Sequence, residues 1–227
     1  MTARYCLHYA PDNASLAVRL ALETLGLDFD TALVDWRAGA LQSSTYRALN
    51  PAGLIPVLET PDGPIFETAA ILLWLADRHG GLGPAPEAPA RGVFLKWLFF
   101  TSNTLHADMR LTFYPQKYVG PDPAHQSALR AGVTDRLLGH LDLLETAVAA
   151  PDWPGGVTEL YLCCLLRWMP LYPESGDRSW FDLTRYPALA AMAARIEATA
   201  AAEAAARAEG LGPTPFTAPR PATPQQG

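Results

Sequence analysis

Cysteine is scarce in this sequence, and its placement does not suit a disulfide scaffold. The 227 residues include 3 Cys, namely Cys6 and the adjacent pair Cys163 and Cys164. An odd number of cysteines with that spacing forms no disulfide framework and fits a reducing compartment. The sequence also has no C-x-x-C pair and no His/Cys cluster with metal-ligand spacing. We therefore expect no disulfides and no metal, with each cysteine packed as a small hydrophobic side chain.

Clusters of positive charge and long apolar runs are also missing. Lys and Arg total 17 against 23 Asp and Glu, which gives a net charge of −6. The basic residues do not cluster, which argues against nucleic acid or an anionic membrane as a partner. The apolar stretch at residues 69–76 is too short to span a bilayer, and no signal peptide is visible. We expect a cytoplasmic protein.

The pattern of what is present predicts two units of different class. Apolar residues make up 49% of the chain, which is enough for a proper core. A strand at 5–9, a helix at 15–25, a strand at 32–34, a loosely helical stretch at 37–49, a hairpin around 57–66 and an apolar helix from 68 give the order β-α-β-α-β-β-α. Helical patterns follow at 91–114, 124–149, 157–169 and 187–208. We predict domains at 1–79 and 91–210, a Gly/Pro-rich linker at 80–90, and an extended, partly mobile Pro-rich tail at 211–227.

Two local patterns suggest a receptor for a small zwitterionic peptide. Pro56 stands at the entrance of a strand, so the Ile55-Pro56 bond is a candidate cis peptide. A cis bond would turn the N–H and C=O of Ile55 outward, free to pair with an extended peptide. Glu67 and Thr68 lie where a strand ends and a helix begins. The unpaired N–H groups there suit a ligand carboxylate, and Glu67 suits an ammonium group.

This stretch resembles a known family. Asn50-Pro51-x-Gly53-x-x-Pro56-Val57-Leu58, a short hairpin, then Glu67-Thr68 and an apolar helix, is similar to the glutathione-binding half of the cytosolic, bacterial-type glutathione S-transferases. The resemblance extends more loosely to most of the chain. It implies a thioredoxin-like α/β N-terminal domain followed by an all-α domain. It also implies a glutathione site whose residues are Leu54, Ile55, Pro56, Glu67 and Thr68, with the Ile55 backbone on the cysteinyl part and Glu67 and Thr68 on the γ-glutamyl end.

The sequence departs from the family at the start of its core helix. Family members usually begin that helix with a Ser/Thr cap and an Asp three residues later. Gly156 and Glu159 occupy those positions here. Glycine is a tolerable N-cap and Glu159 is long enough to reach back to the cap, so we expect the helix to form.

Several residues are candidates to stabilise a glutathione thiolate. A hydroxyl or amide donor beside a helix N-terminus lowers a thiol pKa. Ser15 starts the first helix, Asn13 is a nearby amide, and Tyr9 is a second hydroxyl. Bacterial family members often carry Cys-Ser in this loop, whereas this chain carries Ala14-Ser15, which argues against mixed-disulfide chemistry. Ser15 is the first candidate, although it could serve only as a helix cap.

A polar stripe on the long helix at 91–114 invites a second assignment. Its members follow one another at steps of three, four and four: Asn103, His106, Arg110 and Tyr114. They would form the wall of a cleft facing the first domain, a dimer seam, or a solvated face. In the first case, Arg110 and a His106 that titrates near neutrality would stabilise charge developing on an electrophile.

These patterns and the resemblance together predict a transferase. We expect a homodimer that joins the glutathione thiolate to small apolar electrophiles, with glutathione as co-substrate and no metal or redox cofactor. Two alternatives remain open. One is a glutathione-binding or protein-interaction module without turnover, and the other is a glutathione-dependent peroxidase or isomerase that uses the same site.

Overall fold

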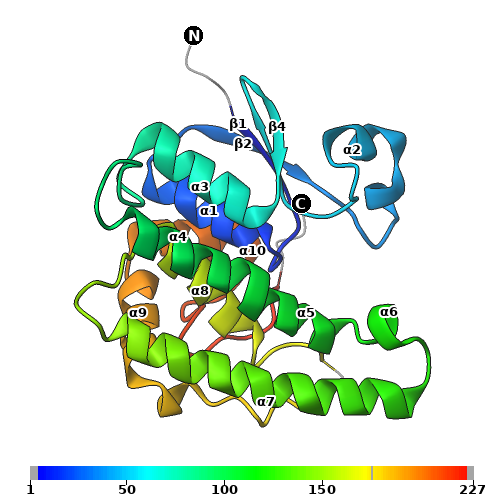
Figure 1. Cartoon of the computed structure of the whole chain (residues 1–227). Coiled ribbons are helices and arrows are strands. Elements are labelled where there is room, and N and C mark those ends of the chain that lie inside the picture. The colour runs from blue at the N-terminus through cyan, green and yellow to red at the C-terminus, as the bar shows by residue number, and fades with distance from the viewer. Residues whose placement is uncertain (1–4, 175, 224–227) are drawn as a thin grey trace.

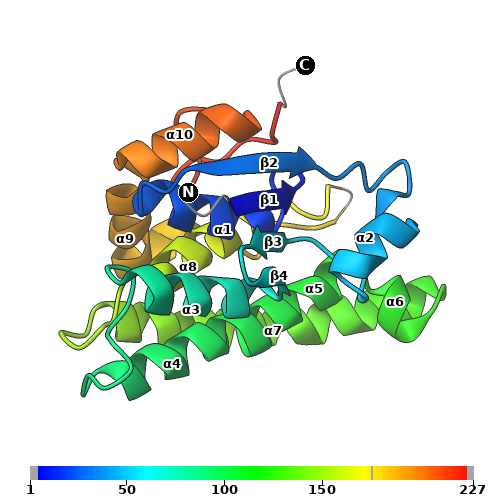
Figure 2. The same cartoon turned by 90° about the horizontal axis from the view of Figure 1, so that it is seen from above.

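The first third of the chain builds a four-stranded mixed sheet. The computed structural model describes residues 5–174 and 176–223. The first four residues of the predicted N-terminal domain and the last four of the predicted tail, 224–227, lie outside the described residues. The strands lie in the order β2-β1-β3-β4 (Figure 2). Parallel β1 (Tyr5–Tyr9) and β2 (Phe29–Leu33) are joined by antiparallel β3 (Val57–Thr60) and β4 (Gly63–Phe66). The second strand therefore begins earlier than the predicted 32–34.

Alternation along the strands separates two faces of the sheet. Leu7 and Leu58 are fully buried beneath α1 (Ser15–Thr24) and α3 (Thr68–His79), in the large core. Val57 faces the other way and packs with Tyr46 of the short helix α2 (Ser44–Leu49), which follows a 3₁₀ turn at Ala40–Gln42. This period of two is the one expected of a pleated strand with both faces covered. The predicted β-α-β-α-β-β-α order is confirmed.

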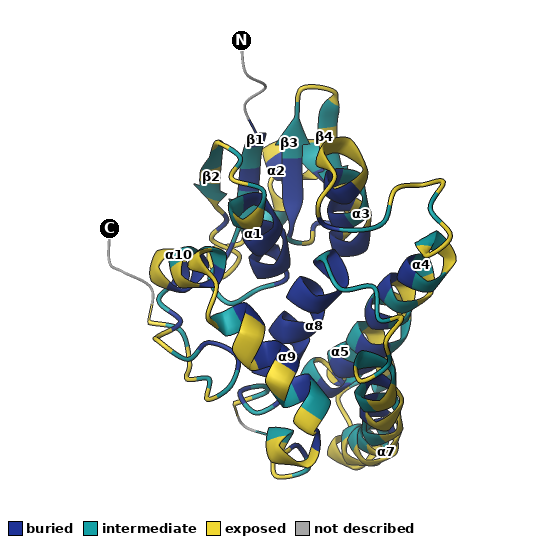
Figure 3. Ribbon diagram, turned by 90° about the vertical axis from the view of Figure 1, so that its left-hand side faces the viewer, coloured by how far each residue is buried: buried dark blue, intermediate teal, exposed yellow. Residues whose placement is uncertain are grey.

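The rest of the chain is helical and packs below the sheet (Figure 1). Its main helices are α4 (Arg91–Phe100), α5 (Ala107–Phe113), α6 (Gln116–Val119), α7 (Pro123–Val148), α8 (Val157–Trp168), α9 (Pro187–Glu197) and α10 (Ala200–Glu209), with a 3₁₀ turn at Leu183–Arg185. Every residue of α8 is buried, which makes it the central helix, dark blue throughout in Figure 3. A thioredoxin-like unit with a helical partner, as predicted, is what the structure shows. Within the described residues, no helix is both long and apolar enough to cross a bilayer.

The predicted single helix at 91–114 is interrupted. Residues Thr101–His106 form a π-helical segment between α4 and α5. Because a π turn closes from i to i+5 rather than i to i+4, residues on either side no longer share one straight face. Sequence periodicity at steps of three and four carries no signal for such a turn, so the interruption was not predicted.

The described part of the C-terminal tail, residues 211–223, packs against the helices, a contact that the sequence did not predict. Leu211 and Phe216 are 2% and 1% exposed and belong to the large core. Glu197 accepts hydrogen bonds from the backbone N–H groups of Phe216 and Thr217, at 2.8 and 2.9 Å. The tail is rich in proline, but the buried Phe216 ring and the Glu197 carboxylate hold it against the helices.

The start of α8 differs from the expected capping arrangement. Gly156 has φ +64°, and Glu159 does not reach back to the cap; its carboxylate instead accepts from Trp153 Nε1 and Arg195 Nη2. The N–H of Val157 donates to the Leu82 carbonyl at 2.9 Å. A β-carbon on Gly156 would lie 2.1 Å from that carbonyl oxygen. Glycine is therefore required here by close approach of the 80–90 segment as well as by its dihedral angle.

A buried polar cluster ties the β1–α1 loop to the helical part. The Asp12 side chain is 2% exposed and the Arg167 side chain 0%. Both Asp12 oxygens accept from Arg167, at 2.8 and 2.9 Å. Each oxygen accepts once more, from Trp168 Nε1 at 2.8 Å and from the Tyr172 hydroxyl at 2.7 Å. We call Asp12, Arg167, Trp168 and Tyr172 the Asp12 hub.

A second buried pair adjoins the hub. The Asp12 N–H donates to Glu209 Oε2 at 2.9 Å, and Arg19 Nε donates to Glu209 Oε1 at 2.8 Å. Glu209 ends α10, Arg19 lies in α1, and these two helices pack together. Burial raises the pKa of Glu209 to about 7, although Arg19 opposes the shift.

Replacing Gly156 by Ala should destabilise the protein by about 3 kcal/mol, since it adds a clash with the Leu82 carbonyl to an unfavourable left-handed backbone. Gly139→Ala is the matched control. Gly139 lies inside α7, and beyond its own turn of helix nothing in the described structure lies within 4 Å of a β-carbon added there. That change should stabilise by about 1 kcal/mol. Urea unfolding measures both, and a Gly156→Ala protein as stable as the wild type would contradict the close-approach argument.

Glu209→Gln should remove a pH dependence of stability. The folded-state pKa of Glu209, about 7, lies above its ordinary value of 4.5. The folded protein thus holds a proton that the unfolded chain loses, so the unfolding free energy falls as pH rises between these values, by about 3 kcal/mol, and is level above them. The charged groups facing Glu209 are Arg19 and Asp12, with the Cys164 thiol also nearby. Urea unfolding at pH 5 and pH 8 should show a smaller loss in the variant. Equal losses would mean that Glu209 does not titrate there.

Candidate functional site

Three chain segments meet at one edge of the sheet. His8, near the end of β1, pairs with Val57, the first residue of β3. Val57 in turn pairs with Phe66, the last residue of β4. The loop after β1, the loop before β3 and the turn after β4 therefore lie side by side. These segments carry the candidate residues 9–15, 54–56 and 67–68.

The loop before β3 presents a fixed backbone. The Ile55-Pro56 peptide is cis, as predicted. The Leu54 carbonyl accepts from the Tyr46 hydroxyl at 2.9 Å and from Asn50 Nδ2 at 2.8 Å. Burial raises the pKa of Tyr46 to about 12, so its hydroxyl remains a donor. Pro56 is buried, Ile55 is half-buried, and Leu54 is exposed.

The Ile55 main chain is available for a ligand. In the described part of the chain, neither its N–H nor its C=O makes a hydrogen bond. The neighbouring bonds to Leu54 hold the loop while leaving Ile55 at its rim. A peptide lying along this rim could pair with both groups, as a strand pairs with a sheet edge.

The turn after β4 leads into a helix N-terminus. Glu67 is exposed, with φ +72° and ψ +113°, a conformation rare for a residue with a side chain. Such backbone outliers concentrate at functional sites. Thr68 begins α3, and the first intrahelical bond runs from Ile71 N to Glu67 O. The N–H groups before Ile71 thus lack helical partners and face a positive dipole end, which is suited to a carboxylate.

Thr68 lies near Tyr161 of α8, in the helical half. The side chains of Thr68 and Ser102 are both close enough to the Tyr161 hydroxyl to act on its pKa. The hydroxyl also lies 2.6 Å from His106 Nδ1. Burial raises the Tyr161 pKa, so the hydroxyl stays protonated. Because Tyr161 is 1% exposed, it acts from behind the site rather than in it.

The structure places the thiolate-donor candidates in different surroundings. Ser15 is 0% exposed; its hydroxyl donates to the Ala10 carbonyl at 3.2 Å and accepts from the Ala10 N–H at 3.4 Å. Asn13 is half-buried, and its Oδ1 accepts from the Ala14 N–H at 2.8 Å. That bond leaves the Asn13 amide NH₂ without a partner among the described residues. Ser15 therefore closes its own loop, while Asn13 has a donor to offer.

Tyr9 is the last residue of β1 and pairs with Leu33 of β2. Its ring is covered by the Arg19 guanidinium, 4.7 Å from the ring centre. Tyr9 is therefore already packed against a side chain of α1.

The polar stripe divides at the π segment. Asn103 is exposed and His106 half-buried, with its ring against Trp168 at 5.6 Å between centres. Burial, aided by Arg110, lowers the pKa of His106 to about 4. The expectation that His106 titrates near neutrality is wrong, because the imidazole packs beneath α8 and stays neutral.

The remaining stripe residues belong to an aromatic group near the loop. Arg110 Nε donates to the Tyr118 hydroxyl at 3.1 Å, and its guanidinium covers the Tyr114 ring. The Phe113 ring packs edge-on against the rings of Tyr114 and Tyr172, with 6.4 Å between ring centres in each pair. Tyr172 bonds Asp12 in the hub. Phe113, Tyr114 and Tyr172 thus form a chain of rings leading from the end of α5 to the β1–α1 loop.

One group of potential metal ligands lies on the neighbouring strands β1 and β3. Donor atoms of Cys6, His8 and Glu59 lie within 4.8 Å of one another, and His8 Nε2 bonds Glu59 Oε1 at 2.7 Å. Strand pairing brings Glu59 beside Cys6, so spacing along the sequence does not reveal the group. The other cysteines, Cys163 and Cys164, are 0% exposed, and burial raises both thiol pKa values.

Sequence reasoning missed the residues that support the site from behind. Asp12, Arg167 and Tyr161 carry no local motif, and the Asp12 partners lie about 155 residues further along the chain. A buried Arg within the apolar run 157–169 was the one available signal, since a buried guanidinium requires acceptors.

Comparison with known proteins gives a consistent result. Residues 14–78 match the family described as "Glutathione S-transferase, N-terminal domain". Glutathione S-transferase GST-4.5 of Xanthomonas campestris is 30% identical over 211 residues, covering 90% of this chain and 98% of that protein. A sphingomonad glutathione S-transferase solved with glutathione shows 30% identity and a TM-score of 0.74, over 91% of this chain and 100% of that one.

A further solved structure agrees. The glutathione S-transferase of Xylella fastidiosa has a TM-score of 0.78 and 26% identity, over 92% of this chain and 100% of that one. The sequence match to the Xanthomonas protein extends through both the sheet and the helical part. On these grounds the chain belongs to the glutathione S-transferase family.

Proposed function

We propose that this protein binds glutathione at the sheet edge and transfers its thiolate to small apolar electrophiles. The observation that carries the proposal is the meeting of three features: the open Ile55 backbone beside a cis proline, the α3 N-terminus at Glu67 and Thr68, and the α1 N-terminus with Asn13. On this proposal residues 1–79 bind glutathione, 91–210 supply the electrophile wall, 80–90 joins them and 211–227 forms the tail.

Each part of glutathione has a matching group. The Ile55 N–H and C=O pair with the cysteinyl backbone, between Leu54 and Pro56. The γ-glutamyl carboxylate lies on the free N–H groups of α3 and the Thr68 hydroxyl, and its ammonium group lies beside the Glu67 carboxylate. This order along the rim points the cysteinyl thiol toward the β1–α1 loop.

The thiolate is stabilised at the N-terminus of α1. A free thiol has a pKa of about 8.5, and lowering it by one to two units takes about 1.4–2.7 kcal/mol of preferential interaction with the anion. The Asn13 amide and the helix dipole together can supply this. The geometry favours Asn13 over Ser15, because the Ser15 hydroxyl would have to leave the Ala10 carbonyl. Tyr9 ranks third, since its ring is packed against the Arg19 guanidinium.

The electrophile lies against the aromatic group at the end of α5. Phe113, Tyr114 and Tyr172 offer apolar rings, and Arg110 adds a fixed positive charge. His106 acts instead through Tyr161, and Asn103 faces solvent. We further propose a cytoplasmic homodimer with a role in detoxification, needing no metal or redox cofactor, because the thiol belongs to the co-substrate.

Thr68→Val and Glu67→Ala should each weaken glutathione binding by about tenfold, since each removes one polar contact with a charged end of the tripeptide. Isothermal calorimetry measures the affinity. Asp62→Ala is the matched control, because Asp62 is an exposed acid at the opposite end of the same hairpin. Unchanged affinity in both site variants would refute this placement of the γ-glutamyl end.

Asn13→Ala should move the pH–rate profile to higher pH, because losing a donor to the thiolate raises the thiol pKa while the tripeptide's other contacts remain. A shift of about one unit corresponds to about 1.4 kcal/mol. Steady-state conjugation measured across pH, with Ser15→Ala and Tyr9→Phe in parallel, ranks the three donors. A profile moved only by Ser15→Ala would reverse the ranking. Glutathione binding without conjugation of any electrophile would favour the binding module, and peroxide reduction or isomerisation in its place would favour the third alternative.

A further inference from the structure

The C-terminal tail and the β1–α1 loop share one buried arginine. Arg167 donates from Nε and Nη2 to the two carboxylate oxygens of Asp12. It also donates to two carbonyls of the tail, from Nη1 to Pro215 at 3.1 Å and from Nη2 to Arg220 at 2.8 Å. With Arg167 fully buried, these acceptors satisfy a charge that water cannot reach. The tail therefore completes the shell of the Asp12 hub.

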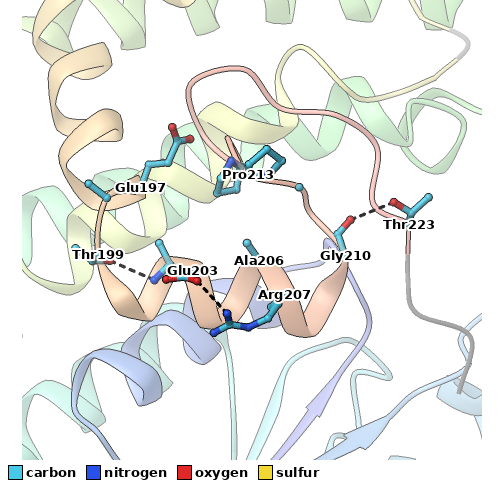
Figure 4. Close-up of a pocket in the computed structure, with 12 residues that line it drawn as sticks. Glu197, Thr199, Glu203, Ala206, Arg207, Gly210, Pro213 and Thr223 are labelled. Atoms are coloured by element: carbon cyan, nitrogen blue, oxygen red, sulfur yellow. Dashed lines mark hydrogen bonds and ion pairs between the residues drawn. The ribbon is translucent and has the colours of Figure 1, made fainter.

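The tail itself is closed into a loop. It leaves α10 at Gly210 and returns so that the Thr223 N–H donates to the Gly210 carbonyl at 2.9 Å (Figure 4). Phe216, 1% exposed, anchors its middle. Between the tail and α10 lies a hollow of about 640 Å³, where Arg207 pairs with Glu203. Held at its base and at its middle, the tail keeps both carbonyls directed at Arg167.

On the other side of Arg167, the hub fixes the loop. Asp12 has φ +53°, a left-handed conformation that a non-glycine residue holds only when its surroundings enforce it. Its carboxylate is bonded by Arg167, Trp168 and Tyr172, and its N–H by Glu209. The next residue is Asn13, followed by the first turn of α1. The direction in which Asn13 and the helix N-terminus point is therefore set from the helical half.

We propose that Asp12 is a positioning residue for the thiolate donors, and that the tail residues 211–223 hold it in place through Arg167. This inference rests on the proposed glutathione site. Asp12 touches neither the thiol nor the electrophile; it determines where the Asn13 amide and the α1 N-terminus lie. Tail docking and thiol activation are thereby coupled through one guanidinium group.

The sign of one measurement separates positioning from simple electrostatics. Removing a negative charge near a thiolate lowers the thiol pKa by Coulomb interaction alone, and leaving Arg167 unpaired lowers it further. Displacing the donors raises the thiol pKa. A raised pKa after loss of Asp12 can therefore come only from movement of the donors, which outweighs the opposing charge effect.

The test compares full-length variants by the thiolate absorbance of bound glutathione across pH, with affinity from calorimetry and folding from circular dichroism. Asp12→Ala removes the hub bonds, and Asp12→Asn keeps a residue that tolerates φ > 0 while removing the charge. Phe216→Ala releases the tail without touching the hub. Leu144→Ala, a buried change in α7, is the matched control for lost packing, and Glu145→Gln, at the carboxylate that caps α9, is the control for a lost carboxylate.

Asp12→Ala and Phe216→Ala should each raise the bound thiol pKa by about one unit, which is a tenfold loss of thiolate below that pKa. Asp12→Asn should raise it less. The glutathione dissociation constant should change little, because Ile55, Glu67 and Thr68 are untouched, and the two controls should match the wild type. Phe216→Ala in the Asp12→Ala background should have no further effect, since both act through Arg167.

Other outcomes overturn the inference. A bound thiol pKa that falls or stays level in folded Asp12→Ala excludes positioning by Asp12. Additive effects of Asp12→Ala and Phe216→Ala exclude the route through Arg167. A shift in Leu144→Ala as large as in Phe216→Ala shows that general loosening is the cause. Wild-type protein that does not bind glutathione overturns the proposed function together with the inference, whereas wild-type protein with a lowered thiol pKa and unaffected variants overturns the inference alone.

Discussion

Strand register at one edge of a small sheet is the constraint on which this molecule depends. Pairing of His8 with Val57, and of Val57 with Phe66, brings together three chain reversals that are far apart in sequence. Each reversal contributes a different kind of group: an open backbone, a helix N-terminus, and a loop with a free amide. A slip of one residue in β3 would turn Leu58 out of the core and Val57 into it, so the apolar core keeps the site aligned.

The second half of the molecule supports this edge from behind. Helix α8 packs against α3, with Tyr161 near Thr68, and the same helix ends in Arg167 and Trp168, which bond Asp12. One fully buried helix thus contacts two of the three reversals. Its polar atoms are costly to bury unless they are bonded, so the contacts they require also fix the loops they meet. The helical part therefore supports the loops of the proposed glutathione site, whose proposed ligand-facing groups belong to the sheet half.

Local signals account for what the sequence predicted. Pro56 before a strand and Thr68 before an apolar run are features of neighbouring residues, and both led to the observed cis bond and helix start. The features that were missed depend on distant partners. Ser15 appeared free because nothing in the sequence shows the Ala10 carbonyl it bonds. His106 appeared titratable because nothing in the sequence shows its packing against Tyr161 and Trp168 of α8. Asp12 and Arg167 are 155 residues apart in sequence, so only the folded structure shows that they pair.

The segment at 80–90 has a composition typical of flexible linkers, yet contacts with both halves of the molecule hold it in place. Leu82 is buried, and its carbonyl occupies the space beside Gly156 while accepting from Val157. Arg91 pairs with Asp77 across the segment and also bonds the Pro84 carbonyl. A connection braced at both ends and in its middle cannot serve as a hinge. Any parting of the two halves at this connection would have to break these hydrogen bonds, so the segment keeps the sheet and the helical part in one arrangement.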